Sequence, residues 1–255
     1  MNKNILISSL AARLFAALAL FTPATHLRAQ GAPGAAVANA KTRTGSVTYF
    51  VAPQCKYELD IFSKEAGEPA DFAGVEKQCA AAKHPMAFAM NGGKCNKSLK
   101  PLGLLIKGLV KYKDFVWPDN NIFFPVGPSA VLAIDRDNGL HIFPANKFKV
   151  ADDLATYRLA IQSGTTLLTR GFMNPVITRA AGTQVCNGIG IRPNGDLVLA
   201  VADSKISLRE FAVFFEEQGC NDAMMLDDGA ACQWYTPGTP KKPGTLGEII
   251  VVTKK

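Results

Sequence analysis

The sequence contains few of the residues that build metal centres and nucleic-acid tracks. It has three histidines, two tryptophans and no Cys-x-x-C pair, so no metal site of the zinc type is expected. Its basic residues are scattered and not interleaved with aromatic ones, which argues against a nucleic-acid partner. After residue 29 no segment approaches the roughly twenty apolar residues of a membrane-spanning helix, so we expect no membrane span in the mature chain.

The N-terminal residues have the layout of a signal peptide. Lys3 and Arg13 precede an apolar run at 14–21, and small residues follow. We predict a signal peptide at 1–29, a flexible linker rich in Ala, Gly and Thr at 30–45, and one domain at 46–255, in a periplasmic or secreted protein. An uncleaved membrane anchor is the alternative, because Arg13 interrupts the hydrophobic stretch.

The charge of the chain is only mildly positive once the leader is removed. The formal net charge is +7, and the leader takes Lys3, Arg13 and Arg28 with it, which leaves 7 − 3 = +4. Such an excess favours phosphate-bearing or acidic glycan substrates slightly. For most of these basic residues a solvated surface is the simpler interpretation.

Export changes the meaning of the cysteines, because disulfides are the default in an oxidising compartment. Spacing alone cannot choose a pairing. Cys220 and Cys232 flank one strand and turn, and Cys55 could pair with Cys79 across the first helix, so both pairs are plausible. The candidates for disulfides are Cys55, Cys79, Cys95, Cys186, Cys220 and Cys232.

Apolar periodicity predicts the α+β class, with a mixed, largely antiparallel sheet and a few packed helices in a single domain. Turn signals at 137–139 and 193–196 favour antiparallel hairpins. Ser207 and Glu210 form a capping box that begins a helix, and Gly219 is expected to end it. A shorter helix is predicted at 72–82. Strands are predicted at 47–51, 57–62, 86–90, 103–106, 131–134, 140–143, 159–161, 188–191, 197–201, 223–226 and 249–252.

Polar residues next to glycine stand at the ends of several predicted strands. Glycine lets a backbone approach a ligand closely, so together these segments describe the floor of a pocket. Taken singly, each is more typical of a plain turn. The segments are Ala89-Met90-Asn91-Gly92-Gly93, Ala160-Ile161-Gln162-Ser163-Gly164, Cys186-Asn187-Gly188-Ile189-Gly190 and Leu226-Asp227-Asp228-Gly229.

In their order these segments resemble the motifs of the phosphodiester glycosidases, a family that includes the lysosomal enzyme that uncovers mannose phosphate tags and many bacterial exported proteins. The resemblance runs from about Tyr49 to Tyr235. The family order is Ala-Met-Asn-Gly/Ala-Gly-Met-Phe, Pro-x-Gly-Leu, Gln-Ser-Gly-Pro, Arg-Asn-Gly-Val-Gly, Gly-Cys-x-Asn-Ala and Leu-Asp-Gly-Gly. The matching segments here are 89–95, 101–104, 162–165, 186–190, 219–223 and 226–229.

The sequence departs from these motifs at the positions closest to the expected chemistry. Lys94-Cys95 replaces the family's Met-Phe, Cys186 replaces its arginine, and Asp228 replaces its glycine. The arginine is the natural phosphate ligand, because a guanidinium donates two parallel hydrogen bonds and keeps its charge. Lys94 and Arg179 are candidates to supply a cation in its place.

The resemblance implies hydrolysis of a sugar-1-phosphodiester in an envelope or extracellular glycan. Asp227 is then the carboxylate that stabilises the sugar cation or activates water, with Asp228 a second candidate. No cofactor is expected, although the two carboxylates could hold a divalent cation. Substrate-binding roles for the sugar hydroxyls and the phosphate fall to Asn91, Gly92, Gly93, Lys94, Gln162, Ser163 and Asn187.

An alternative is a catalytically silent member of the fold that binds a glycan or a protein partner. The loss of the arginine at Cys186 favours it. In the family, the segments that match 89–95 and 186–190 contribute to one site. The resemblance therefore also implies that Cys95 and Cys186 are neighbours, and we predict a disulfide between them. Such a bond would occupy the place of the arginine.

Overall fold

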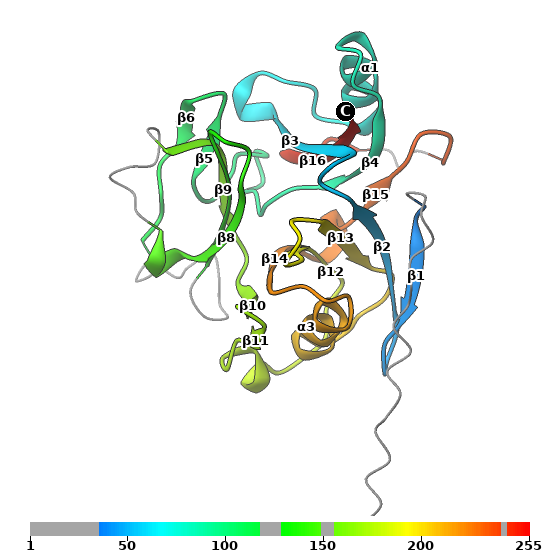
Figure 1. Ribbon diagram of the computed structural model, residues 1–255, viewed down its shortest axis with the longest axis vertical. Coiled ribbons are helices and arrows are strands. Elements are labelled where there is room, and N and C mark those ends of the chain that lie inside the picture. The colour runs from blue at the N-terminus through cyan, green and yellow to red at the C-terminus, as the bar shows by residue number, and fades with distance from the viewer. Residues whose placement is uncertain (1–35, 118–128, 149–155, 241–243) are drawn as a thin grey trace, which may run out of the picture.

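Three antiparallel sheets and two α-helices form the part of the protein that the computed structural model describes (Figure 1). That part is residues 36–117, 129–148, 156–240 and 244–255, so the predicted signal peptide lies outside it. The predicted α+β class and its antiparallel character are confirmed, but the strands divide among three sheets. No helix in these ranges is both long and apolar enough to span a membrane.

The seven-stranded sheet has the order β1-β2-β13-β12-β14-β10-β11, the four-stranded sheet the order β15-β4-β16-β3, and the five-stranded sheet the order β6-β5-β9-β7-β8. The bounds of the strands and α-helices are β1 Ala38–Lys41, β2 Ser46–Ala52, β3 Tyr57–Ser63, α1 Phe72–Ala81, β4 Met86–Asn91, β5 Leu105–Lys107, β6 Val110–Lys113, β7 Ala130–Asp135, β8 Leu140–Pro144, β9 Tyr157–Ser163, β10 Thr166–Thr169, β11 Phe172–Met173, β12 Cys186–Ile191, β13 Leu197–Ala202, α3 Leu208–Glu217, β14 Asp222–Asp228, β15 Trp234–Tyr235 and β16 Glu248–Lys254.

The predicted turns and caps appear where local sequence rules place them. The turn at 137–139 joins β7 to β8, with Asn138 at a positive φ of 66°. The turn at 193–196 joins β12 to β13. Ser207 accepts a hydrogen bond from Glu210 N, whose side chain returns to the Ser207 backbone, and Gly219 follows α3 in the left-handed conformation.

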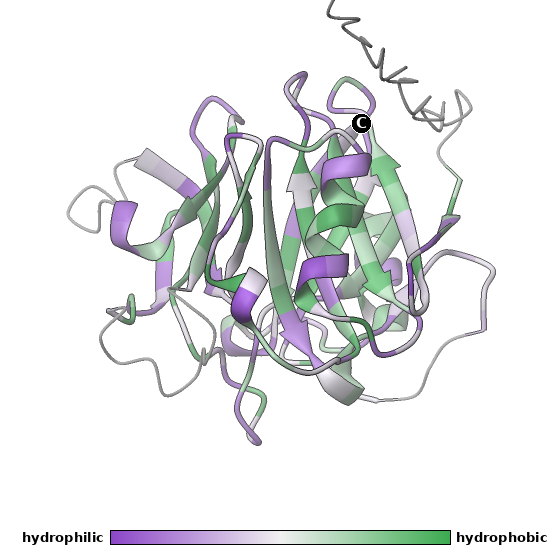
Figure 2. Ribbon diagram, turned by 90° about the horizontal axis from the view of Figure 1, so that it is seen from below, coloured by the Kyte–Doolittle hydropathy of each residue, from purple (hydrophilic) through white to green (hydrophobic). Residues whose placement is uncertain are grey.

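Apolar side chains of all three sheets meet in one core. The ribbon is coloured hydrophobic along much of the strands that line this core (Figure 2). Phe50 of β2 and Phe88 of β4 stack there with ring centroids 5.2 Å apart, and Leu226 of β14 and Ile161 of β9 belong to the same cluster. Helix α3 covers the other face of the seven-stranded sheet, with Phe211 and neighbouring rings packed on it. The polar ends of β4, β9, β12 and β14 converge beside this core.

Strand β1 corrects the predicted linker at 30–45. Ala38–Lys41 pairs with β2 in register, and Thr48 Oγ1 donates a hydrogen bond of 2.8 Å to Asn39 Oδ1. Order therefore begins before Ser46. The sequence pattern missed this strand because its small residues have no apolar alternation. It also missed β6, β10, β11 and β15, which are two to four residues long and depend on their partners.

All six cysteines are free thiols, so the predicted disulfides are wrong in this structure. Cys186 and Asn187 are successive residues of β12 and point to opposite faces. Asn187 points toward Asn91, whereas Cys186 packs among apolar residues on the α3 face. Cys95 lies on the Asn91 side, with its Sγ 3.5 Å from Gly93 O. The sheet therefore separates Cys95 from Cys186.

The two local pairs also lack a disulfide, and the members of each pair lie in different surroundings. Cys220 precedes β14 and packs in the cluster under α3, and Cys232 follows the same strand and belongs to the core shared by the sheets. The length of the strand separates the two thiols. Cys55 is exposed in the turn between β2 and β3, whereas Cys79 is a buried residue of α1.

Candidate functional site

A bulge in β14 creates the candidate site. In the pairing of β12 with β14, Gly188 lies opposite Met225 and Asn187 lies opposite Asp227, so Leu226 is the extra residue. A bulge bends a strand and redirects the side chains that follow it. Here it sends Asp227 toward β4, and Asp228 follows directly.

The bulge is held by a serine and a glycine at the end of β9. Ser163 Oγ donates a 2.6 Å hydrogen bond to Leu226 O and accepts a 2.8 Å bond from Lys94 N. Gly164 has a φ of 37°, and a Cβ at that position would lie 1.9 Å from Met225 O. Only glycine allows this approach, so the Ser-Gly pair joins β14 to the loop that follows β4.

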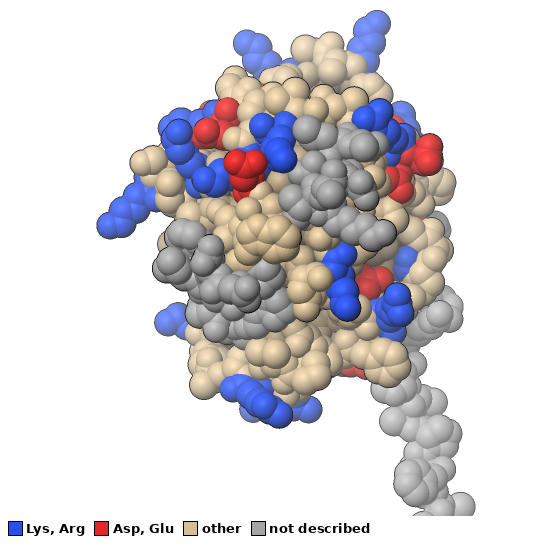
Figure 3. Space-filling model, turned by 90° about the vertical axis from the view of Figure 1, so that its left-hand side faces the viewer, with Lys and Arg blue, Asp and Glu red and all other residues tan. Residues whose placement is uncertain are grey.

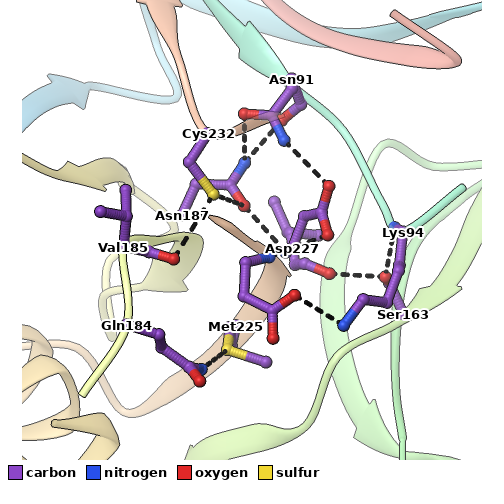
Figure 4. Close-up of polar contacts among 11 residues, drawn as sticks. Asn91, Lys94, Ser163, Gln184, Val185, Asn187, Met225, Asp227 and Cys232 are labelled. Atoms are coloured by element: carbon purple, nitrogen blue, oxygen red, sulfur yellow. Dashed lines mark hydrogen bonds and ion pairs between the residues drawn. The ribbon is translucent and has the colours of Figure 1, made fainter. Parts of the chain in front are cut away.

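Two asparagines fix Asp227 from the neighbouring strands (Figure 4). Asn187 Oδ1 accepts a 2.8 Å hydrogen bond from Asp227 N, and Asn187 Nδ2 donates to both Asn91 O at 2.6 Å and Asn91 Oδ1 at 3.1 Å. Asn91 Nδ2 in turn donates to Asp227 Oδ2 at 3.4 Å. Asn187 is completely buried and uses its amide inside the protein. It therefore positions Asn91 and Asp227 from the interior.

Asp227 is a nearly buried carboxyl group whose pKa is shifted upward. Its exposed fraction is 7%, and burial raises its pKa from 3.8 to about 6, although hydrogen bonding from Asp228 N and the charge of Lys94 act in the opposite direction. Oδ1 accepts from Asp228 N at 2.8 Å. Each carboxylate oxygen has two acceptor positions, so both keep one for a ligand or a water molecule.

Lys94 supplies the cation of the site. Its Nζ lies 2.7 Å from Asp228 Oδ1, and both side chains are partly exposed. An ammonium group has three N–H donors, so this contact leaves two for another anion. Arg179, the other cation considered, is exposed in the turn Ile177–Arg179.

Gln162 lies apart from this network, in the interior of the five-stranded sheet. Its Oε1 accepts from Val116 N at 2.8 Å and Leu104 N at 3.3 Å, and its Nε2 donates to Val116 O at 2.6 Å and Ser129 Oγ at 2.8 Å. These bonds occupy all the polar positions of the amide. In this structure Gln162 ties the loop at 115–117 to β9, and a direct role in substrate binding stays a prediction.

The sequence pattern missed two residues next to the site. Glu248, the first residue of β16, is buried, and its Oε2 accepts a 2.9 Å hydrogen bond from Gly93 N. Cys232 Sγ lies 4.0 Å from Asn187 Oδ1. A lone glutamate that opens an apolar strand was the only available signal for Glu248, and it is a common surface pattern.

Within the described ranges, no three His, Cys, Asp or Glu side chains are grouped so as to hold a metal ion. The divalent cation considered for Asp227 and Asp228 would meet the Lys94 ammonium, which already faces Asp228. The Lys94 ammonium therefore already occupies the position beside Asp228 at which such a cation would bind.

Comparison with known proteins connects this geometry to one family. The model of the family described as phosphodiester glycosidase matches residues 84–252. The uncharacterised protein YigE of Escherichia coli strain K12 is 26% identical over 192 residues, which cover 74% of this chain and 74% of that protein.

Solved structures share the fold at low sequence identity. The zebrafish N-acetylglucosamine-1-phosphodiester alpha-N-acetylglucosaminidase catalytic domain, auto-inhibited by its pro-peptide, matches with a TM-score of 0.57 and 16% identity over 87% of this chain and 83% of that one. A hypothetical protein from Synechocystis matches with a TM-score of 0.53 and 12% identity over 86% of this chain and 61% of that one.

Proposed function

Because the chain belongs to the phosphodiester glycosidase family, we propose that it is an exported hydrolase, periplasmic or secreted, that cleaves a sugar-1-phosphodiester in an envelope or extracellular glycan. The observation that carries the proposal is the placement of Asp227. This carboxyl group is fixed by two buried asparagines and stands next to the Lys94–Asp228 ion pair. A carboxylate and a cation side by side suit a reaction that develops positive charge on a sugar and negative charge on phosphate.

The reaction breaks the bond between the anomeric carbon and the phosphate oxygen. That oxygen keeps the bonding electrons and leaves as part of a phosphate monoester, and water supplies the new oxygen on the sugar. Asp227, once ionised, stabilises the sugar cation or accepts the proton of the attacking water. The leaving group is already an anion, so a strong general acid is not required.

Lys94 is the residue that we assign to the phosphate. It comes from the loop after β4 and reaches Asp228 at the end of β14, so it delivers a charge to the site from another sheet. Lys and Arg side chains are also more abundant than acidic ones on the face that carries the five-stranded sheet (Figure 3). Such a surface would attract an anionic glycan.

A catalytically silent glycan-binding member of the fold is the second candidate, and one observation favours it. Cys186 stands where the family motif has arginine, and its side chain is completely buried among apolar residues. A single lysine makes point-charge contacts and lacks the fork of a guanidinium. The phosphate is therefore held less firmly than in a site with arginine.

Purified mature protein should release free sugar from a nitrophenyl glycosyl-phosphodiester. The matched control is Asp227→Asn, which keeps the shape of the side chain and removes its charge. Sugar release by the wild type and its loss in the variant support the hydrolase. Binding of envelope glycans without any turnover across a panel of sugars would support the silent member. Fractionation of the native host, with the protein absent from the periplasm and the medium, would contradict export.

A further inference from the structure

Glu248 is a buried acid without a cationic partner in the described part of the chain. Its exposed fraction is 3%, and it starts β16, an inner strand of the four-stranded sheet. Oε2 accepts the hydrogen bond from Gly93 N, whereas Oε1 is buried and has no hydrogen-bond partner there. An ionised carboxylate with an unpaired oxygen in such a place is costly, and a neutral carboxylic acid is much less so.

The side chain of Glu248 supports the glycine turn that leads to Lys94. A Cβ on Gly92 would lie 2.6 Å from Glu248 Cβ, and a Cβ on Gly93 would lie 2.8 Å from Glu248 Oε2. Gly92 N also donates a 2.8 Å hydrogen bond to Glu248 O. On the far side, Ser163 Oγ accepts from Lys94 N. The turn is therefore clamped between Glu248 and Ser163.

The charged and titratable groups around Glu248 favour retention of its proton. Burial, opposed by the hydrogen bond from Gly93 N and assisted by the charge of Asp227, raises its pKa from 4.5 to about 7. Cys95 is the other titratable neighbour, and burial raises the pKa of its thiol, with a smaller contribution from Glu248. The Lys94 ammonium faces Asp228. Asp227 accepts two N–H hydrogen bonds and is near the Lys94 charge, whereas Glu248 accepts one hydrogen bond, so Asp227 ionises before Glu248.

We propose that Glu248 is a positioning residue that remains a neutral carboxylic acid beside Asp227, holds the Gly92-Gly93 turn through Oε2, and thereby keeps Lys94 facing Asp228. Only one of the two buried acids, Asp227, is ionised in the working state. The catalytic part of the proposal rests on the proposed function, whereas the protonation of Glu248 does not. Two neighbouring acids with separated ionisation define a narrow working range, which begins when Asp227 loses its proton and ends when Glu248 does.

The test compares wild type with Glu248→Gln and Glu248→Leu, and uses Glu210→Gln as the control. Glutamine copies the neutral acid and keeps an acceptor for Gly93 N, whereas leucine provides none. Glu210 lies in the capping box of α3; burial raises its pKa, but hydrogen bonds from Ser207 and Thr44 outweigh this, so its pKa is lowered. Urea unfolding is measured for each protein between pH 4 and 8 (roughly the range spanned by the two ionisations).

The direction in which stability changes with pH follows from the linkage between proton binding and folding. A folded-state pKa above the unfolded value means that the folded protein holds a proton that the unfolded chain releases, so stability is greatest below the unfolded pKa of 4.5 and is lost as the pH rises toward about 7. Wild type and Glu210→Gln should show this fall. In Glu248→Gln the part of this fall above pH 6 should be absent, because Asp227 is already ionised there and the remaining titration belongs to Glu248. The same pH dependence in wild type and Glu248→Gln would overturn the proposal.

Activity gives a second readout on the same proteins. Glu248→Gln should keep the wild-type rate near pH 6 and extend it on the alkaline side by about one pH unit or more, whereas Glu248→Leu should lose activity at every pH. Loss of activity in Glu248→Gln at pH 6, with an intact fold, would contradict the neutral state. If wild type does not turn over at all, the proposed function fails while the unfolding profile still decides the state of Glu248. If Glu248→Leu does not fold, Glu248→Gln alone carries the test.

Discussion

The backbone N–H of Asp227 donates a hydrogen bond to the side-chain oxygen of Asn187 at 2.8 Å, at the bulge in the pairing of β12 with β14. The Asn187 side chain thus supplies a hydrogen-bond acceptor where the extra residue Leu226 interrupts the backbone ladder between β12 and β14. The same amide bonds Asn91 on β4. One buried side chain therefore links two sheets and sets the direction of the carboxylate between them.

Asp227→Asn should abolish sugar release, by at least about 100-fold in kcat, because the variant keeps the shape but cannot hold a negative charge. The fold should remain, with a melting temperature at pH 8 equal to or above that of the wild type. The reason is that the buried carboxylate, whose pKa is about 6, costs stability once ionised. Initial rates and thermal melts on the same preparations check both statements. Most of the activity surviving with an unchanged melting temperature would make Asp227 a structural residue.

The pH dependence of the wild-type rate should carry the signature of Asp227. The working form is ionised, so the rate should rise with pH through about 6, the pKa that burial imposes. A rate profile of kcat/KM from pH 4 to 8 (about two units on either side) measures this limb. A limb near 4 instead would mean that the essential carboxylate is an exposed one.

Lys94→Met should reduce kcat/KM by about 10- to 100-fold, since it removes the cation that we assign to the phosphate and leaves Asp228 unpaired. Lys97→Met is the matched control, because Lys97 lies three residues on in the same loop but is exposed. Its kinetics should be those of the wild type. Equal losses in both variants would assign the effect to general surface charge, and no loss in either would remove Lys94 from the site.

Gly164→Ala should destabilise the fold by about 3 kcal/mol or more, because the new methyl group would lie 1.9 Å from Met225 O at a φ of 37°. Gly182→Ala separates the two causes. Gly182 also has a positive φ, of 89°, but no atom lies within 4 Å of its added Cβ, so only the backbone cost of about 1–2 kcal/mol is expected. Urea titrations compare them, and equal losses would show that the β9–β14 contact has room to relax.

Thiol alkylation tests the absence of disulfides. Unfolded protein that has never been reduced should expose six reactive thiols, because all six cysteines are free. In the native state Cys55 should react first, since it is exposed, whereas burial raises the pKa of Cys220 to about 12 and that of Cys186 well above its ordinary value. Peptide mass mapping after timed alkylation follows each site. Thiols missing from the unfolded, unreduced protein would restore a disulfide.

The sequence by itself determined the elements whose signals are local. The helix from Leu208 to Glu217 has its capping box and its closing glycine within the same stretch, and the two hairpins carry their turn residues between their strands. The order of the motifs around Asn91, Asn187 and Asp227 likewise identified the family before any contact was known. Such signals depend on neighbours in the chain, and a sequence displays these directly.

The tertiary structure alone decided which of these residues meet. Lys94 reaches Asp228 only because a bulge and the Ser163-Gly164 corner bring β14 to the loop after β4. Glu248 enters the site from the far end of the chain through the register of β16 with β4. Strand parity sent Cys186 to the face away from Cys95. These outcomes depend on register and on the face to which a side chain points, and a shift of one residue reverses that face.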